Sequence, residues 1–255
     1  MQVSLVDLLG ASLFLKEPVT PLFQRYYTLG LFAAVENDWL RMISLKVKKP
    51  CPFLNQNLCS IYPVRPLPCI LFPEYLVAEG RLAAEAKKET FRNYLCLKSS
   101  QVLSPARAEV LAQLKKMWRR EGLISSFYLF GHSSCYLDLK DVAEVLLSAP
   151  GNPRLDSNES KEQKKPPAHI PHEAIEFFFW KHIAPCRPFS EVEDRIRRLE
   201  HPQGQAELWQ YFQEEHWFRK IRQGEKDRAL IFRFRKGQVR MTRRSLISSD
   251  CYCFI

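Results

Sequence analysis

Residues 51–73 read CPFLNQNLCSIYPVRPLPCILFP and hold three cysteines and five of the chain's 17 prolines. Prolines at this density exclude a continuous helix, because each one removes a backbone donor and restricts the residue before it. We therefore expect a rigid, extended and turning path, with a tight turn at Asn55-Gln56-Asn57. Prolines also lower the entropy of the unfolded chain, so a ligand set on this path would be partly preorganised.

Four cysteines in and after this stretch follow the series Cys51-x7-Cys59-x9-Cys69-x26-Cys96. Together, the four thiolates could hold one tetrahedral zinc ion or an iron–sulfur cluster. The spacing is not the paired C-x2-C spacing of zinc ribbons, so a set of buried free thiols remains the alternative. Arg65 would offset part of the negative charge of the thiolates, which makes it a candidate for binding beside the metal.

The residues around these cysteines resemble a known pattern: C-P-F-L, then Cys, I-Y, R-P, Cys and F-P. The matching positions are Cys51, Pro52, Phe53, Leu54, Cys59, Ile61, Tyr62, Arg65, Pro66, Cys69, Phe72 and Pro73. This pattern is similar to the core of the YkgJ-type cysteine-cluster proteins, a zinc- or iron-chelating family. The resemblance covers roughly residues 20–100 and implies a metal site there.

The chain departs from the family pattern in two places. No cysteine precedes Cys51, whereas family members carry an earlier C-x2-C-x2-C-C cluster, and Ile70 stands where the family commonly has arginine. Three interpretations follow. The chain binds one metal through its four cysteines, its site has become a packing motif, or the earlier cluster lies upstream of the sequence given.

Composition excludes several other classes. With 46% hydrophobic and 26% charged residues, the 255-residue chain resembles a globular protein of one or two compact domains. It contains neither glycine-rich nucleotide-binding motif, and no apolar run approaches the roughly 18 residues of a membrane span.

The N-terminal segment lacks the basic start of a signal peptide, because its first basic residue is Lys16. We therefore expect an amphipathic helix there and a cytoplasmic protein. In that reducing compartment, the eight cysteines would be free thiols or metal ligands.

The predicted fold class is α+β, mainly helical, with a short β-hairpin in a small cysteine-cluster domain and a helical, basic C-terminal region. Apolar spacing predicts helices, and turn residues separate the predicted strands. One helix is expected to begin at Leu5, and another to run from about Lys87 past Cys96. Further expected helices cover 21–34, 39–45, 105–122, 139–147, 172–184, 190–200 and 203–222. The expected strand pairs are 70–77 with 81–86, and 229–234 with 238–242 around Lys236-Gly237.

Residues 149–168 are predicted to form a linker, because they hold four prolines, a charged centre and a single large apolar residue. The predicted organisation is a YkgJ-like cysteine-cluster domain at 1–148, with its core at 20–100, and a helical region at 169–255. The second region ends in a basic hairpin and a Cys251-Tyr252-Cys253 tail, for which an auxiliary ligand pair and a tail without a role stay open.

Positive charge is concentrated at residues 218–244, which carry 11 Lys and Arg against two acids. The alternating order places Ile231, Arg233 and Arg235 on one strand face, and Phe232 and Phe234 on the other. Arginines free to bind phosphates and exposed rings free to stack would indicate a nucleic-acid partner. The interpretation favoured here is an ordinary hairpin with buried phenylalanines and solvated arginines.

The function predicted from the sequence is metal binding by a cysteine cluster, with zinc or iron as the ion. A structural or storage role is favoured over catalysis, because no general base stands out near the cysteines. Two alternatives stay open. One is a metal-free protein whose basic region binds nucleic acid or an acidic partner, and the other is an accessory protein or enzyme related to the flagellin lysine methylases, whose cysteine cluster is similar.

Overall fold

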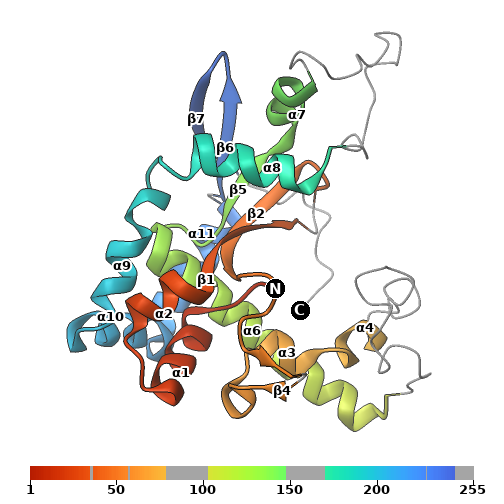
Figure 1. Cartoon of the computed structure of the whole chain (residues 1–255), viewed down its shortest axis with the longest axis vertical. Helices are drawn as coiled ribbons and strands as arrows, with labels where there is room; N and C mark the ends of the chain where they lie inside the picture. The colour runs from red at the N-terminus through yellow and green to blue at the C-terminus, as the bar shows by residue number, and fades with distance from the viewer. Residues whose placement is uncertain (35–36, 57, 79–102, 148–169, 228, 245–255) are drawn as a thin grey trace.

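The protein is organised around a mixed five-stranded sheet with the order β1-β2-β5-β6-β7, seen in a computed structural model (Figure 1). The structure describes residues 1–34, 37–56, 58–78, 103–147, 170–227 and 229–244. Neighbouring strands are antiparallel except β5 and β6, which are parallel. The strands are β1 (Tyr27–Ala33), β2 (Leu40–Val47), β5 (Cys135–Asp138), β6 (Ala229–Arg235) and β7 (Gln238–Arg244).

Two of the predicted helices are wrong. The helix predicted at 21–34 ends at Tyr26, where strand β1 begins, and the segment predicted as a helix at 39–45 is strand β2. Leu31 lies opposite Ile43 in the resulting antiparallel ladder. Gly30 permits this pairing, because a Cβ there would lie 2.4 Å from Cδ of Lys46.

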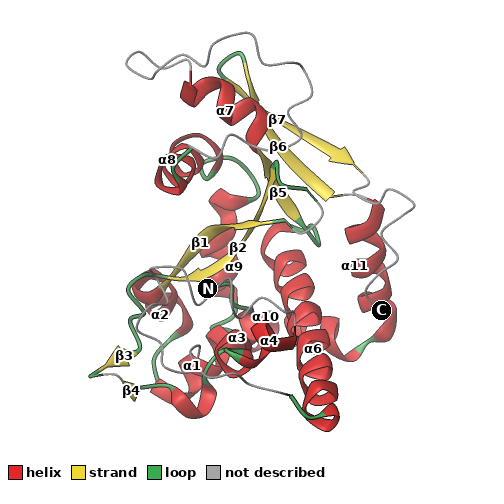
Figure 2. Ribbon diagram, turned by 90° about the vertical axis from the view of Figure 1, so that its right-hand side faces the viewer, coloured by secondary structure: helices red, strands yellow, loops and turns green. Residues whose placement is uncertain are grey.

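Helices from the first half of the chain pack together on one side of the sheet (Figure 2). They are α1 (Leu5–Leu15), α2 (Val19–Tyr26) and the long α6 (Pro105–Phe130). Helix α7 (Leu139–Leu147) follows β5 and packs against β6 instead. Ser104 caps α6 and Pro105 occupies its first turn, as the sequence predicts. The helix runs past the predicted end at Gly122 and stops at Gly131, which has a φ of 69°.

The C-terminal region is helical before its hairpin, as expected. It contains α8 (His172–Phe178), a π-helical turn at Phe179–Ile183, a 3₁₀ turn at Phe189–Glu191, α9 (Val192–Arg198), α10 (Pro202–Gln213) and α11 (Glu215–Asp227). The single helix predicted at 203–222 is in fact two, because the chain turns at Glu214 between α10 and α11. The β6–β7 hairpin is confirmed, and both turn residues, Lys236 and Gly237, have positive φ.

Residues on both sides of the predicted linker contribute to one sheet and one hydrophobic core. Leu230, Phe232 and Phe234 of β6 pack in the main core with residues of α1, β1, β2 and α6. On the other face, Ile231 joins a smaller cluster with Leu40 and Tyr136. The α+β, mainly helical fold class is therefore confirmed.

No helix within the described ranges is long and apolar enough to cross a membrane. The predicted linker at 149–168, the predicted strand at 81–86, the predicted helix from about Lys87 past Cys96, and Cys251 and Cys253 all lie outside the described residues.

Candidate metal centre

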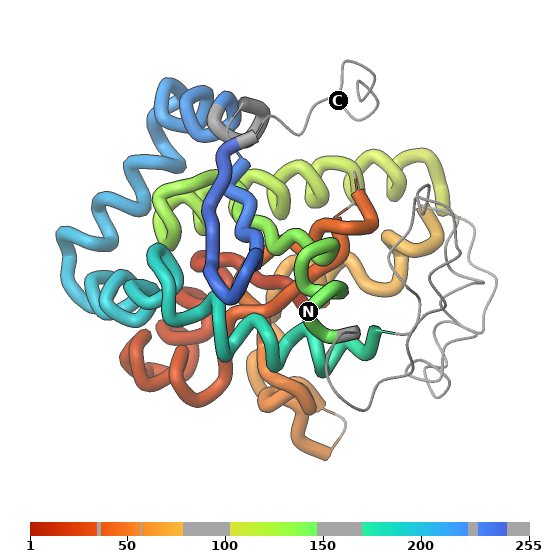
Figure 3. The backbone as a smooth tube through the Cα atoms, turned by 90° about the horizontal axis from the view of Figure 1, so that it is seen from above, coloured from red at the N-terminus to blue at the C-terminus, as the bar shows by residue number. Residues whose placement is uncertain are grey.

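The first part of the cysteine segment is a small projecting hairpin (Figure 3). Strand β3 (Leu54–Asn55) pairs with β4 (Leu58–Cys59), and Leu54 lies opposite Cys59. Gln56 has a φ of 48°, which the tight turn between the strands requires. The turn predicted at Asn55-Gln56 is thus present, and it places Cys51 and Cys59 at the base of one hairpin.

The second part of the segment is helical, so the strand predicted at 70–77 is wrong. A 3₁₀ turn at Tyr62–Val64 leads to α3 (Leu67–Leu71), which carries Cys69, and then to α4 (Glu74–Ala78). Pro68 lies in the first turn of α3, where its fixed φ and missing N–H favour a helix start. The apolar run at 70–77 has the composition of a strand, but its neighbouring prolines divide it into two short helices.

Buried side chains fasten the segment to the protein core. Phe53 is 4% exposed, and its ring lies 5.1 Å from the ring of Tyr26 and 5.9 Å from that of Tyr27. Ile61 is also buried in the main core. The path between Cys51 and Cys69 is therefore held to the core at two points.

The three described candidate ligands differ in accessibility. Cys51 is exposed, whereas Cys59 and Cys69 are half-buried. Burial, with smaller contributions from the neighbouring Cys51 and Cys59 thiols, raises the pKa of Cys69 to about 11. The three thiols lie within electrostatic reach of one another, and a metal would have to displace the proton of Cys69. The fourth candidate, Cys96, lies outside the described residues.

Arg65 lies beside this group but holds no thiol directly. Its guanidinium lies 3.9 Å from the centre of the Tyr62 ring, and it donates a hydrogen bond to the Tyr62 carbonyl at 3.1 Å. Its charge opposes the larger causes that raise the pKa of Cys69. These contacts hold its charge near Cys69, and a role for Arg65 beside a metal stays a prediction.

Two residues outside the segment also contribute to the site. The sulfur of Met1 lies 3.2 Å from Sγ of Cys69, which donates a weak hydrogen bond to it. Tyr27 is 1% exposed, and its hydroxyl has no hydrogen-bond partner among the described residues. Burial, followed by the nearby Asp7, Cys51 and Cys69, raises the pKa of Tyr27 above its ordinary range. An unpaired buried hydroxyl is costly, and a thiolate beside it would supply the missing acceptor.

Asp7 organises the helix ends around the site. With Ser4 it forms a capping box at the start of α1, and its other oxygen accepts a hydrogen bond from the Leu67 amide at the start of α3. Ser4 also donates to Glu121 of α6 at 3.0 Å. Sequence reasoning missed these residues, although the pattern Ser-x-x-Asp before an apolar run is a recognisable capping signal. No comparable sequence signal indicates Met1 or Tyr27.

The three described candidate cysteines do not form a closed cage in the part of the chain that the structure describes. Within it, no three His, Cys, Asp or Glu side chains are close enough together to enclose a metal ion. The donor chemistry nevertheless suits zinc or iron: three thiols, a positive guanidinium and an unpaired buried hydroxyl share one neighbourhood. Cys51, Cys59 and Cys69 would move together on binding, with Cys96 as the expected fourth ligand.

Residues 22–97 match the sequence model of the CxxCxxCC family, described as "Putative zinc- or iron-chelating domain". The predicted family resemblance is confirmed. The matched residues include the hairpin, α3 and α4, together with the end of α2, β1 and β2 before them. No curated protein and no solved structure matches the chain.

The strand β6 of the basic C-terminal hairpin uses its side chains in internal contacts. Phe232 and Phe234 are buried, as the favoured interpretation expected. The arginines of β6 are paired rather than simply solvated: Arg233 contacts Asp138 at 3.1 Å, and Arg235 contacts Asp141 at 3.1 Å. Both aspartates are buried, so this face of β6 uses its positive charge within the fold.

Proposed function

We propose that the cysteine-cluster domain binds one zinc or iron ion through Cys51, Cys59, Cys69 and Cys96, and that the ion has a structural rather than a catalytic role. The single observation that carries this proposal is the shared neighbourhood of three thiols on a path braced by Phe53. The family match at residues 22–97 supports it independently.

A structural role follows from what the ligands connect. Cys51 and Cys59 flank the β3–β4 hairpin, whereas Cys69 lies in α3. An ion held by all three would join the projecting hairpin to the body of the protein, so its binding free energy would stabilise the fold. The nearest buried carboxylate, Asp7, is already bonded to Ser4 and Leu67, so it is not a free general base.

The test is anaerobic purification followed by metal analysis of the wild type and of two serine variants. We expect about one equivalent of zinc or iron in the wild type, loss of the metal in Cys59→Ser, and retention in Cys186→Ser. Cys186 is the matched control, because it is half-buried like Cys59 and lies outside the segment. A coloured protein would indicate iron, and a colourless protein zinc.

Thiol alkylation gives a second readout on the same protein. Bound metal should protect Cys51, Cys59, Cys69 and Cys96 from a small alkylating reagent, and chelation should release them together. Cys186 should react at the same rate in both states. The proposal is wrong if the wild type contains neither metal, or if Cys59→Ser keeps its full metal content.

A further inference from the structure

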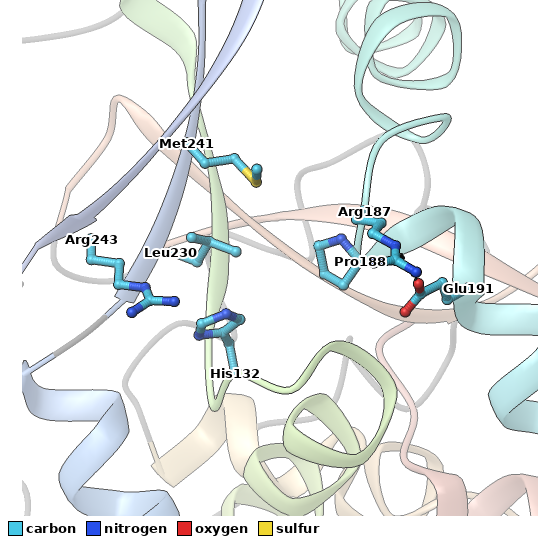
Figure 4. Close-up of a pocket in the computed structure, with 7 residues that line it drawn as sticks. All are labelled: His132, Arg187, Pro188, Glu191, Leu230, Met241 and Arg243. Carbon is cyan, nitrogen blue, oxygen red and sulfur yellow. Dashed lines mark ion pairs between the residues drawn. The ribbon is translucent and has the colours of Figure 1, made fainter.

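A second candidate site lies between the β6–β7 hairpin and the turn that precedes α9. It is a cavity of about 410 Å³, formed by elements other than the cysteine segment (Figure 4). Its lining combines two arginines, a histidine and a glutamate with three apolar side chains. These residues are His132, Arg187, Pro188, Glu191, Leu230, Met241 and Arg243.

One wall of the cavity carries the positive charge of Arg243. Arg243 of β7 and His132 lie side by side there (Figure 4). No carboxylate among the described residues pairs with Arg243, in contrast to Arg233 and Arg235 on the neighbouring strand. Burial and the adjacent Arg243 lower the pKa of His132, so the histidine is mainly neutral near pH 7 and keeps one N–H donor.

The opposite wall is already internally paired. Arg187 forms an ion pair with Glu191, and Glu191 also lies 3.5 Å from Arg195. The two lining arginines therefore outnumber the one lining carboxylate, and the excess charge lies at Arg243. An incoming anion would find its free cation on the Arg243 side of the cavity.

The charged wall is held in place by the backbone. Arg243 is the ladder partner of Leu230, which also lines the cavity. Two hydrogen bonds fix the loop that carries His132. The His132 carbonyl accepts from the Ser126 hydroxyl at 2.9 Å, and the Ser134 carbonyl accepts from the Leu230 amide at 3.1 Å. Such a pair of donors is preorganised, which lowers the entropy cost of binding.

The remaining lining residues are apolar. Leu230 is buried at the base of the cavity, Pro188 faces it from the opposite side, and Met241 is 55% exposed at the hairpin. Bare inorganic phosphate would leave these surfaces uncovered. A ligand with an apolar part of moderate size would cover them.

We propose that this cavity binds a small organic anion, a phosphate ester or a carboxylate, with its charged group at Arg243 and His132 and its apolar part against Met241, Leu230 and Pro188. The site is separate from the proposed metal centre, so either can be wrong without the other.

The probe is phenyl phosphate, titrated into the full-length protein by calorimetry, with phenylacetate as the carboxylate probe and phenol as the uncharged one. We expect binding of at least one anion and none of phenol at the same concentrations. Arg243→Gln should weaken binding by at least about tenfold, because a charge-assisted hydrogen bond is lost. Arg240→Gln is the matched control, since it removes the same charge from the same strand at a residue outside the cavity lining.

Met241→Ser tests whether the apolar lining of the cavity contributes to binding, or whether anions are attracted only by the basic surface. It should weaken the binding of phenyl phosphate and leave the weaker binding of inorganic phosphate unchanged. Circular dichroism checks that each variant is folded. Equal losses in Arg243→Gln and Arg240→Gln would overturn the proposal, as would the absence of binding by both organic anions.

Discussion

The carboxylate of Asp7 accepts a hydrogen bond from the backbone amide of Leu67, 3.2 Å away and 60 positions later in the chain. The same side chain accepts from the amide of Ser4 at 2.7 Å. One carboxylate therefore caps α1 and α3 at once, and α3 carries Cys69. The position of the candidate ligand Cys69 thus depends on Asp7, a residue in the first turn of α1.

Replacing Asp7 with alanine should destabilise the protein by about 2 kcal/mol, because the starts of α1 and α3 both lose a hydrogen-bond acceptor. Removal of a buried carboxylate offsets part of this loss, since its burial is unfavourable. Urea unfolding of the metal-free protein measures this change. Asp194→Ala is the control, since Asp194 is exposed in the first turn of α9 and pairs with the exposed Arg197, and it should change stability by less than about 0.5 kcal/mol. Equal effects of the two substitutions would contradict the double-cap role of Asp7.

Glu121 should make stability depend on pH. Burial and the nearby Asp7 raise the pKa of its carboxyl from 4.5 to about 7. The folded state then binds the proton more tightly than the unfolded state. The free energy of unfolding therefore falls as pH rises from 4.5 to 7, and it falls no further through this group above pH 7.

Glu121→Gln removes the charge and keeps an acceptor for the Ser4 hydroxyl. We expect equal stability of variant and wild type below pH 4.5, and a gain in the variant above pH 7. The gain should be on the order of 1 kcal/mol, because partial exposure screens the charge. Urea unfolding across this pH range provides the measurement. A difference that does not change with pH would show that burial of the charge is not its cause.

Tyr27→Phe should have opposite effects on stability and on metal binding. Without metal, removal of an unpaired buried hydroxyl should stabilise the protein by about 1 kcal/mol. With metal, loss of a donor to a thiolate should weaken the affinity by roughly tenfold. Thermal melts of the metal-free protein and competition with a chelator measure the two effects.

Tyr26→Phe is the matched control for this substitution. Its ring also packs against Phe53, but its hydroxyl contacts the exposed Arg25 instead of facing the thiols. It should leave the metal affinity unchanged. Unchanged affinity in Tyr27→Phe as well would exclude a role for the Tyr27 hydroxyl at the metal site without affecting the cysteine ligands.

Gly204 should be intolerant of a side chain, because a Cβ there would lie 2.1 Å from the carbonyl oxygen of Arg198. Gly204→Ala must shift α10 away from the end of α9 and should cost about 1 to 3 kcal/mol in the free energy of unfolding. Gly10→Ala is the counterpart, since nothing lies within 4 Å of its Cβ position in α1. That variant should gain about 0.5 to 1 kcal/mol from helix propensity. Urea unfolding compares the two, and a loss in Gly10→Ala would contradict the open space beside α1.

Local chemistry is sufficient to predict several features of this protein. The prolines and cysteines of residues 51–73 point to the family whose model matches residues 22–97 and to the candidate ligands, because turn residues and thiols act through their own covalent structure. The cap at Ser104-Pro105 and the turn at Lys236-Gly237 are predictable for the same reason. Each of these signals lies within a few residues of the structure that it specifies.

Only the tertiary structure decides the features that depend on distant partners. The apolar spacing across residues 21–34 taken together suits one helix, but pairing with β2 buries the alternating residues Tyr27, Leu29 and Leu31 on a strand instead. Arg233 and Arg235 look available for an external partner until β6 places them beside Asp138 and Asp141. The surroundings of Cys69 are likewise set by Met1 and by Asp7 through Leu67. A thiol specifies that it can bind a metal, whereas its neighbours, brought together by folding, determine its proton affinity and its position.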